Sequence, residues 1–380
     1  MIKKVSFSIF DTGETILGAI VFSVFFPLYI TKYISVETFT FFYGIVFLIS
    51  FIISLQLGKI ADERNLRKGF FTFFTVSIFL LTLLLAIVSN NYILSLLIFF
   101  LLAITHQQNL VFYNSLLTDF KEKGFISGLG VSLGYIGSAI ALMFFAQYLE
   151  IPYVYIFTAL VFMLLALPSI LFIENPNIKP KKINLKVIFS DKEFLLIILS
   201  ILFLTEIANT LISLMGVYLK EVYKLEDTEI YKVIGFSSVG GIVGGIIWGY
   251  LTKFFDIKNL FVVGFIFWFS FLIILPFTPK DFLLVVGLFA GFSLSHLWTT
   301  SRVLIIEVFP KNEVSTRLSF LSITERISSS LGLMVWSFLL TLTKSYQLTV
   351  LLMSVFVVIG WLIFVFRNKL SLLLIKEKGV

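Results

Sequence analysis

The sequence predicts an all-α polytopic membrane protein in which twelve transmembrane helices form two six-helix, pseudo-symmetric halves. Three observations support this fold. The chain of 380 residues is 59% hydrophobic and only 13% charged, whereas a soluble domain has roughly 25% charged residues. Its hydrophobic residues occur in runs of about twenty, the length that a helix needs to cross a bilayer. The two halves of the chain also repeat the same features at a nearly constant offset.

The hydrophobic runs are separated by short polar loops, and each run predicts one membrane-spanning helix. A transmembrane β-barrel would instead show segments of about ten residues with alternating hydrophobicity. The first run is longer than the core of a signal peptide and contains acids, so we expect no cleavable signal. The chain has no cysteine, which excludes disulfides and cysteine-bound metals, and we expect no cofactor. The predicted spans are 8–31, 38–57, 70–88, 92–117, 125–149, 154–173, 193–219, 230–252, 260–277, 282–309, 319–343 and 348–366.

Lysine and arginine are distributed unevenly between the two sides of the predicted membrane. The two termini and the loops at 58–69, 118–124, 174–192, 253–259 and 310–318 contain 21 of them, whereas the opposite loops contain 5. Positive residues gather on the cytoplasmic side of membrane proteins, so both termini are predicted to be cytoplasmic. This distribution accounts for the net charge of +7. There is no basic groove with interleaved aromatic residues, so nucleic-acid binding is not expected.

The two halves of the chain repeat the same features at an offset of about 191 residues. The stretch "GKIADERNLRK" starts at Gly58, and "GYLTKFFDIKN" starts at Gly249, each after the second span of its half. We therefore predict an N-terminal six-helix bundle at 1–178, a cytoplasmic linker at 179–192 and a C-terminal six-helix bundle at 193–380. Three further pairs keep nearly the same offset: Glu14 with Glu206, Ser127 with Ser319, and His106 with His296.

Polar residues are concentrated in the first helix of each group of three spans. Polar groups inside a bilayer must face the interior of the helix bundle or a water-filled cavity. Spans 1, 4, 7 and 10 are therefore expected to surround one cavity between the halves. The residues expected there are Asp11 and Glu14 in span 1, His106, Gln107 and Asn109 in span 4, Glu206 and Asn209 in span 7, and His296 and Arg302 in span 10.

Spans 5 and 8 contain glycines at short, regular spacing, in "GLGVSLGYIG" and "GGIVGGIIWG". Small residues at this spacing let two helix backbones approach closely. Tight helix packing is the simpler interpretation, and a seam that slides as the two halves move is the alternative.

The loop "LGKIADERNLRKG" resembles the signature loop between the second and third helices of the major facilitator superfamily. Gly58 and Asp62 match the glycine and aspartate of that signature, while Asn65 and Leu66 replace a glycine and an arginine. The resemblance implies two six-helix halves in parallel repeat. It also implies a cytoplasmic gate in which the aspartate pairs with a basic residue and with an acid of helix 4. The residues for that gate are Gly58, Asp62, Arg64 or Arg67, and Asp119.

A narrower resemblance covers most of the chain. The stretches "FDTGETILG", "VFFPLYIT", "FYNSLL", "ISGLGVSLGYIG", "TEIANTLI" and "TSRVLIIEVFP" are similar to blocks of the autophagy-related vacuolar effluxer-like family, in the family's order. This resemblance implies a facilitator of a bacterial or archaeal cell membrane that exports small solutes, with amino acids as the substrate class. Asp11 matches the opening motif of that family, whereas Glu14 stands where the family has asparagine.

Three acids within the spans are the strongest candidates for a transport site. Asp11 lies in the first turns of span 1, where the helix dipole favours an anion, so it has a structural explanation as well as a functional one. Glu14 lies on the same face at i, i+3 and deeper in the membrane. Its counterpart Glu206 is near the middle of span 7. We expect Glu14 and Glu206 to bind a proton or a cationic group of the solute. Buried ion pairs with Arg302 and Arg326 are the alternative.

Two further residue types have competing interpretations. Arg302 lies near the cytoplasmic end of span 10, where it either reaches the membrane interface or binds a substrate carboxylate. His106 and His296, with Glu14 and Glu206, offer ligand types that suit several divalent ions. No spacing such as His-Glu-x-x-His supports a metal site, so we expect these histidines to form hydrogen bonds in the cavity.

The sequence therefore predicts a secondary active transporter that works by alternating access and exports a small solute. No Gly-x-x-x-x-Gly-Lys-Ser/Thr loop is present, so ATP is not the expected energy source. The expected partners are the solute, protons and the lipid bilayer, and a monomer is expected. The alternatives are a multidrug or metal-ion facilitator, a membrane scaffold, and a membrane-embedded enzyme. An enzyme is not favoured, because the loops are short and the polar groups lie within repeated helices.

Overall fold

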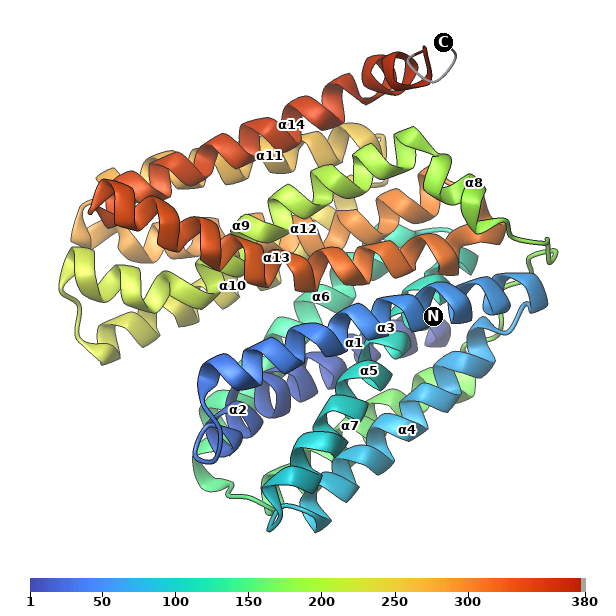
Figure 1. The fold of residues 1–380 in the computed structure, drawn as a ribbon, viewed down its shortest axis with the longest axis horizontal. Coiled ribbons are helices and arrows are strands. Elements are labelled where there is room, and N and C mark those ends of the chain that lie inside the picture. The colour runs from blue at the N-terminus through green and yellow to red at the C-terminus, as the bar shows by residue number, and fades with distance from the viewer. Residues whose placement is uncertain (377–380) are drawn as a thin grey trace. The chain divides into compact units, whose positions relative to one another are not determined.

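The computed structural model describes the backbone of residues 1–376, and Figure 1 shows helices joined by short loops. Within this range the side chains of residues 37, 147, 227, 323, 325–330 and 371–376 are not described. A helix lies at each of the twelve predicted spans, and no strand occurs among the described residues. Eleven helices of the described part of the chain are long and apolar enough to cross a membrane, and a twelfth contributes the shorter apolar stretch Leu331–Thr343. The predicted fold class is confirmed.

Spans 1 to 6 are formed by the first helices of the chain. Span 1 consists of α1 (Ile2–Leu17), a π-helical segment η1 (Gly18–Phe25) and α2 (Phe26–Ile30). Span 5 consists of α6 (Lys123–Ile140) and a second π-helical segment, η3 (Ala141–Phe145). The remaining spans of this half are α3 (Val36–Arg64), α4 (Arg67–Ile87), α5 (Tyr92–Leu116) and α7 (Tyr153–Phe172).

Spans 7 to 12 follow the short linker helix α8 (Leu185–Ser190). They are α9 (Lys192–Tyr223), α10 (Asp227–Leu251), α11 (Ile257–Ile274), α12 (Leu283–Val308), α13 (Val314–Thr343) and α14 (Tyr346–Lys376). Five short 3₁₀ turns lie at the helix ends: η2 (Leu117–Asp119), η4 (Ala146–Tyr148), η5 (Leu275–Phe277), η6 (Lys280–Phe282) and η7 (Lys311–Glu313).

Local sequence explains where many of these helices begin and end. A polar side chain accepts a hydrogen bond from a backbone N–H of the first turn and so satisfies a donor that the helix leaves free. At the other end, α3 stops at Asn65, whose φ of 52° is left-handed. The residues whose side chains cap a helix N-terminus by accepting such a hydrogen bond include Ser35 for α3, Asn91 for α5, Asp191 for α9 and Asp256 for α11.

The chain forms two compact units. The first comprises Met1–Ile183 together with Ile305–Ser322, and the second comprises Asn184–Leu304 with the chain from Ile323 onward. The end of the first segment lies close to the linker predicted at 179–192. Residues 305–322, however, belong to the C-terminal bundle in the sequence repeat and cluster with the first unit in the structure. The reason is a set of hydrogen bonds to α3 and α4, described below.

Glycines determine the closest helix contacts within each unit. In the first unit the glycines of α6 face α1, and a Cβ added at Gly130 would lie 1.9 Å from Oδ2 of Asp11. In the second unit α10 and α12 approach each other backbone to backbone. A Cβ at Gly240 would lie 2.0 Å from the carbonyl oxygen of Leu288, and one at Gly291 would lie 1.7 Å from that of Ser237. Only glycine permits these approaches, as the spacing of small residues predicts.

The substitution Gly291→Ala should therefore destabilise the second unit. The new methyl group meets backbone atoms of α10 that no side-chain rotation can move, and overpacking of this kind costs roughly 1–3 kcal/mol. The matched control is Gly235→Ala in α10, where an added Cβ meets no atom within 4 Å. Thermal unfolding of the purified proteins should show a lower melting temperature for Gly291→Ala. The melting temperature of Gly235→Ala should equal that of the unsubstituted protein. Equal melting temperatures would contradict the tight contact between α10 and α12.

Candidate functional site

The structure brings Glu14 of α1 and His106 of α5 together in the first unit. Nε2 of His106 lies 3.0 Å from Oε1 of Glu14, a hydrogen-bond distance. The imidazole is 3% exposed, whereas the Glu14 side chain is 20% exposed. Both residues were predicted to face one cavity, from spans 1 and 4. The pair is thus a carboxylate that remains partly accessible and a histidine that is buried behind it.

This pair can hold a proton in more than one way. An imidazole nitrogen either donates to a carboxylate or accepts from a carboxylic acid, so the hydrogen bond requires one proton between the two groups. The other ring nitrogen of His106, Nδ1, is buried and has no hydrogen-bond partner among the described residues. Histidine also changes charge more readily than other side chains near neutral pH. The pair thus consists of two groups, each of which is able to carry a proton.

The π-helical segment η1 places an aromatic ring against this pair. The ring of Phe22 lies 4.8 Å from the ring of His106, measured between centroids. In an α-helix a residue eight positions after Glu14 would point about 80° away from it. A π-helix turns less per residue, because its hydrogen bonds join residues five apart. The winding of η1 therefore rotates Phe22 toward the face that carries Glu14.

The other polar residues of α5 mainly join neighbouring helices. Nδ2 of Asn109 donates to the carbonyl oxygen of Phe71 at 3.2 Å and to Oγ1 of Thr75 at 2.8 Å, both on α4. Gln108 is hydrogen-bonded to Ser50 and Ser54 of α3. Asn109 was predicted to face the transport cavity, and the structure instead engages its amide with α4. Gln107 is buried on the same helix.

Asp11 lies one turn before Glu14 and is buried. Gly130 of α6 has no Cβ, and this absence leaves room for the Asp11 side chain. The backbone carbonyl of Asp11 accepts a hydrogen bond from the hydroxyl of Thr15 at 2.7 Å. The close approach of α6 thus encloses Asp11 between two helices of the first unit, whereas Glu14 keeps a partly exposed carboxylate.

Glu206 occupies α9 of the second unit and is 5% exposed. Its backbone carbonyl accepts a hydrogen bond from the hydroxyl of Thr210 at 2.7 Å. Gly332 of α13 packs against it, because a Cβ there would lie 3.0 Å from Cγ of Glu206. No side chain of the described residues forms a hydrogen bond or ion pair with the Glu206 carboxylate. Arg326, one predicted partner, lies outside the described side chains.

His296 has a different environment from His106, although the sequence repeat pairs them. Its Nε2 lies 2.8 Å from the carbonyl oxygen of Leu260 on α11, and its ring packs edge-on against Trp248 of α10 at 4.7 Å. The two histidines are 190 residues apart, whereas Glu14 and Glu206 are 192 apart. A difference of two residues turns a helical side chain by about 200°. His296 therefore joins α12 to its neighbours within the second unit.

Arg302 and Asn209 complete the predicted set within the second unit. Arg302 is buried on α12, and Asn209 is partly exposed on α9. Among the described residues, no group of three or more histidine, aspartate and glutamate side chains is arranged to hold a metal ion.

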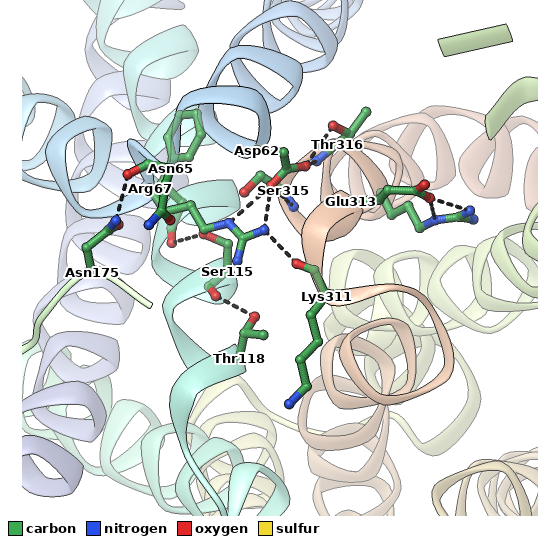
Figure 2. A network of polar contacts seen from close by, with 12 residues as sticks. Asp62, Asn65, Arg67, Ser115, Thr118, Asn175, Lys311, Glu313, Ser315 and Thr316 are labelled. Atoms are coloured by element: carbon green, nitrogen blue, oxygen red, sulfur yellow. Dashed lines mark hydrogen bonds and ion pairs between the residues drawn. The ribbon is translucent and has the colours of Figure 1, made fainter. Parts of the chain in front are cut away.

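A second polar site of the first unit is centred on Asp62 at the end of α3 (Figure 2). Oδ1 of Asp62 accepts hydrogen bonds from Nη2 and Nε of Arg67 at 2.7 and 3.1 Å, and both side chains are buried. Oδ1 and Oδ2 also accept from the backbone N–H groups of Ser315 at 3.2 Å and Thr316 at 2.9 Å. Asp62 therefore caps the N-terminus of α13, and its negative charge meets the positive end of that helix.

Further contacts hold α13 in this position. Nη2 of Arg67 donates to the backbone carbonyl oxygen of Lys311 at 2.6 Å. The hydroxyl of Ser319 donates to the backbone carbonyl oxygen of Ser54 at 2.9 Å. A Cβ at Gly58 would lie 3.0 Å from the Ser315 backbone, so glycine permits the approach of α3. We call Asp62, Arg67, Lys311, Ser315 and Thr316 the Asp62 network. It explains why residues 305–322 cluster with the first unit.

The structure distinguishes among the residues predicted for the cytoplasmic gate. Arg67 is the basic partner of Asp62, whereas Arg64 is exposed at the end of α3. Asp119, the predicted acid, is exposed in η2 and forms none of the hydrogen bonds of the Asp62 network. The first turn of α13 binds Asp62 in place of the predicted acid Asp119. The sequence signal for that turn was Pro310 followed by the serine and threonine of "NEVST", which is typical of a helix start.

The chain matches the family model of the Major Facilitator Superfamily over residues 15–253 and 198–372. It is 54% identical to an uncharacterised protein of Aquifex aeolicus (strain VF5) over 371 residues, which cover 97% of this chain and 98% of that protein. It is 25% identical over 402 residues to the uncharacterised MFS-type transporter YxiO of Bacillus subtilis (strain 168), covering 95% of this chain and 94% of that protein.

Three solved structures have a similar fold. A bacterial homologue of the iron transporter ferroportin superposes with a TM-score of 0.77 at 17% identity, covering 97% of this chain and all of that one. The human organic anion transporter MFSD10 gives 0.77 at 8% identity, with coverages of 96% and 98%. The Escherichia coli fucose:proton symporter FucP gives 0.74 at 13% identity, with coverages of 96% and 97%. At these identities the similarity concerns the fold alone.

The Asp62 network predicts unequal effects for two aspartate substitutions. Asp62→Asn removes the charge that compensates buried Arg67, and breaking a buried ion pair costs roughly 3–5 kcal/mol. Asp119→Asn removes the same charge at an exposed position outside the network. Melting temperatures in lipid nanodiscs should fall for Asp62→Asn and stay at the unsubstituted value for Asp119→Asn. The opposite order would assign the gate to Asp119.

Proposed function

Since the chain belongs to the Major Facilitator Superfamily, we propose that it exports a small solute by alternating access and couples this transport to protons through Glu14 and His106. The family makes the chain an integral membrane protein and a secondary transporter of small solutes rather than an enzyme. Membership of the family does not establish export or proton coupling, and these two parts of the proposal rest on the observations that follow.

The observation that carries proton coupling is the hydrogen bond between Glu14 and His106. A charged group at the centre of a bilayer costs about 2.5–3.5 kcal/mol on insertion scales, so an acid there usually has a function or a partner. Glu14 has a partner that itself takes up protons, and the carboxylate remains partly exposed. A proton that enters or leaves therefore changes the charge of a site that a solute can reach.

Glu206 is a second candidate for proton or solute binding, in the other unit. Its carboxylate is buried beside α13 and has no ion-pair partner among the described side chains. A buried charge without a partner is costly, so this position favours a group that takes up a proton or meets a cationic solute. The sequence repeat, which pairs it with Glu14, supports the same role.

Export rests on the resemblance of the sequence to the autophagy-related vacuolar effluxer-like family. That resemblance also favours amino acids as the substrate class. The E. coli structure with a similar fold is a fucose:proton symporter, which supports proton coupling within this fold. The replacement of the family's asparagine by Glu14 adds a negative charge to the proposed site, so the solute of this chain should differ in charge from that of the family.

A metal-ion facilitator is the second candidate function. Imidazole and carboxylate are ligands that suit several divalent transition ions, and Glu14 and His106 supply one of each. A solved structure with a similar fold is a homologue of the iron transporter ferroportin. A metal site would need further ligands beyond this pair.

Flux measurements in proteoliposomes test the proposal. A panel of amino acids, sugars, organic cations and divalent metals is offered with and without a pH gradient. We expect the gradient to drive one class of solute, and both Glu14→Gln and His106→Gln to reduce this response to background. Solute exchange without a gradient should persist in His106→Gln. Glu150→Gln is the matched control, because Glu150 is exposed in a loop. Unchanged gradient-driven flux in both variants would exclude coupling through the pair.

The cytoplasmic location of both termini is tested by labelling single cysteines, since the chain has none of its own. Lys181→Cys and Asn90→Cys are both at exposed positions. In right-side-out vesicles a membrane-impermeant maleimide should label Asn90→Cys and leave Lys181→Cys unlabelled until the membrane is opened, as the positive-inside distribution predicts. The reverse pattern would invert the topology.

A further inference from the structure

Within the six predicted spans of the N-terminal half, the acidic and basic side chains are of only one sign. Within the six predicted spans between residues 8 and 173 there is no lysine or arginine, and the acids are Asp11 and Glu14. The basic residues of this part of the chain lie at the helix ends, such as Arg67 and Lys123 at the starts of α4 and α6. Asp11 is enclosed against Gly130, so Glu14 presents the accessible charge.

Aromatic rings continue from the Glu14–His106 pair along spans 1, 2 and 4. Phe22 lies against His106 and, at 5.3 Å between centroids, beside Phe99 of α5. Phe99 is stacked on Phe26 of α2 at 3.7 Å and lies 5.3 Å from Tyr43 of α3. The partly exposed carboxylate is therefore next to a cluster of aromatic rings from three helices. Phe22, which is 9% exposed, lies nearest the pair, and Phe26 and Phe99 are fully buried behind it.

The two features together select for positive charge. The face of an aromatic ring is negative and attracts a cation within about 6 Å of its centroid. A carboxylate in surroundings of low dielectric attracts the same cation far more strongly than it would in water. An anionic solute of the same shape meets repulsion from both groups, and such repulsion is a common source of specificity.

We propose that Glu14 and Phe22 recognise an organic cation, a solute with a positively charged centre and an apolar body. This rests on the proposed transport function and names its substrate class. The cation pairs with the Glu14 carboxylate, and Phe22 packs against its apolar body. Protonation of the Glu14 carboxylate removes the negative charge that the cation requires, so the proton and the cation compete for the same carboxylate.

The experiment measures binding to the purified full-length protein by equilibrium dialysis. The probe is radiolabelled tetraphenylphosphonium, and tetraphenylborate is the anion of nearly the same size and shape. We expect saturable binding of the cation alone. Glu14→Gln should weaken it roughly tenfold or more, since the charged partner is lost. Phe22→Leu should weaken it roughly three- to tenfold, and Phe22→Tyr, which keeps the ring, should bind as the unsubstituted protein does.

Matched controls separate these effects from general changes in charge or stability. Glu150→Gln removes the same charge in an exposed loop, and Phe73→Leu removes a ring that is 62% exposed on α4. Both should bind the cation with unchanged affinity. Equal affinity for the cation and the anion, or undiminished cation binding by Glu14→Gln, would overturn the inference.

The binding and flux experiments distinguish a failure of the proposed cation site from a failure of the proposed transport function. Cation binding that depends on Glu14, without gradient-driven flux of any solute, would support the site and contradict the transport function. Gradient-driven flux of another solute class, without saturable cation binding, would support transport and overturn the inference of an organic cation.

Discussion

A charged or polar group inside a lipid bilayer must find its partner within the protein, and this constraint determines which helices meet. In the first unit it pairs Glu14 of α1 with His106 of α5, at 3.0 Å. The same requirement joins α5 to α3 through Gln108 and to α4 through Asn109. Most polar residues of α5 therefore hold helices together, and we propose that the pair with a partly exposed carboxylate exchanges a proton or meets a solute.

The Asp62 network applies this principle to a helix end. A helix start leaves backbone N–H groups without partners, and α13 receives its cap from a carboxylate on α3, far away in the sequence. Arg67 compensates the charge of Asp62 and reaches the Lys311 carbonyl. As a result, residues 305–322 join the first unit although the rest of their repeat forms the second. A transporter with this arrangement has a helix, α13, whose start is held by one unit and whose remainder belongs to the other.

Irregular backbone and small residues adapt regular helices to these polar contacts. Glycines of α6 make room for Asp11, and those of α10 and α12 allow direct contact between backbones. The π-helical segment η1 turns Phe22 toward the ring of His106. Neither adaptation adds polar groups to the membrane, because each keeps the backbone hydrogen bonds within the helix.

Much of the fold was predictable from the sequence, because hydrophobic length alone identifies a membrane span. The span predicted at 92–117 is observed as Tyr92–Leu116. Other helices are longer than predicted: α3 continues to Arg64 where the span was predicted to end at 57, and α14 continues to Lys376 where it was predicted to end at 366. The start of α13 was predicted at 319 and lies at Val314, since its cap comes from a distant residue that no local pattern reveals. The π-helix was not predicted, because span 1 is apolar on most of its faces and shows no break in periodicity.

The candidate site was predictable in part. The polar residues of spans 1 and 4 indicated Glu14 and His106, and the structure places them in contact. The repeat suggested the same role for His296, but a shift of two residues turns it toward the carbonyl of Leu260. A repeat therefore identifies equivalent helices more reliably than equivalent side-chain directions. The aromatic contact of Phe22 depends on the irregular winding of η1 and could not be read from spacing.

The central claim is that Glu14 and His106 share a proton, and solid-state NMR of the protein labelled with ¹⁵N-histidine in lipid bilayers tests it directly. The chain has two histidines, so each gives its own signal, and His296→Gln identifies which is which. We predict that the His106 signal changes with pH and that Glu14→Gln alters this response, whereas the His296 signal is unaffected by the substitution. A His106 signal with the same pH response in the presence and absence of the Glu14 carboxylate would contradict the claim.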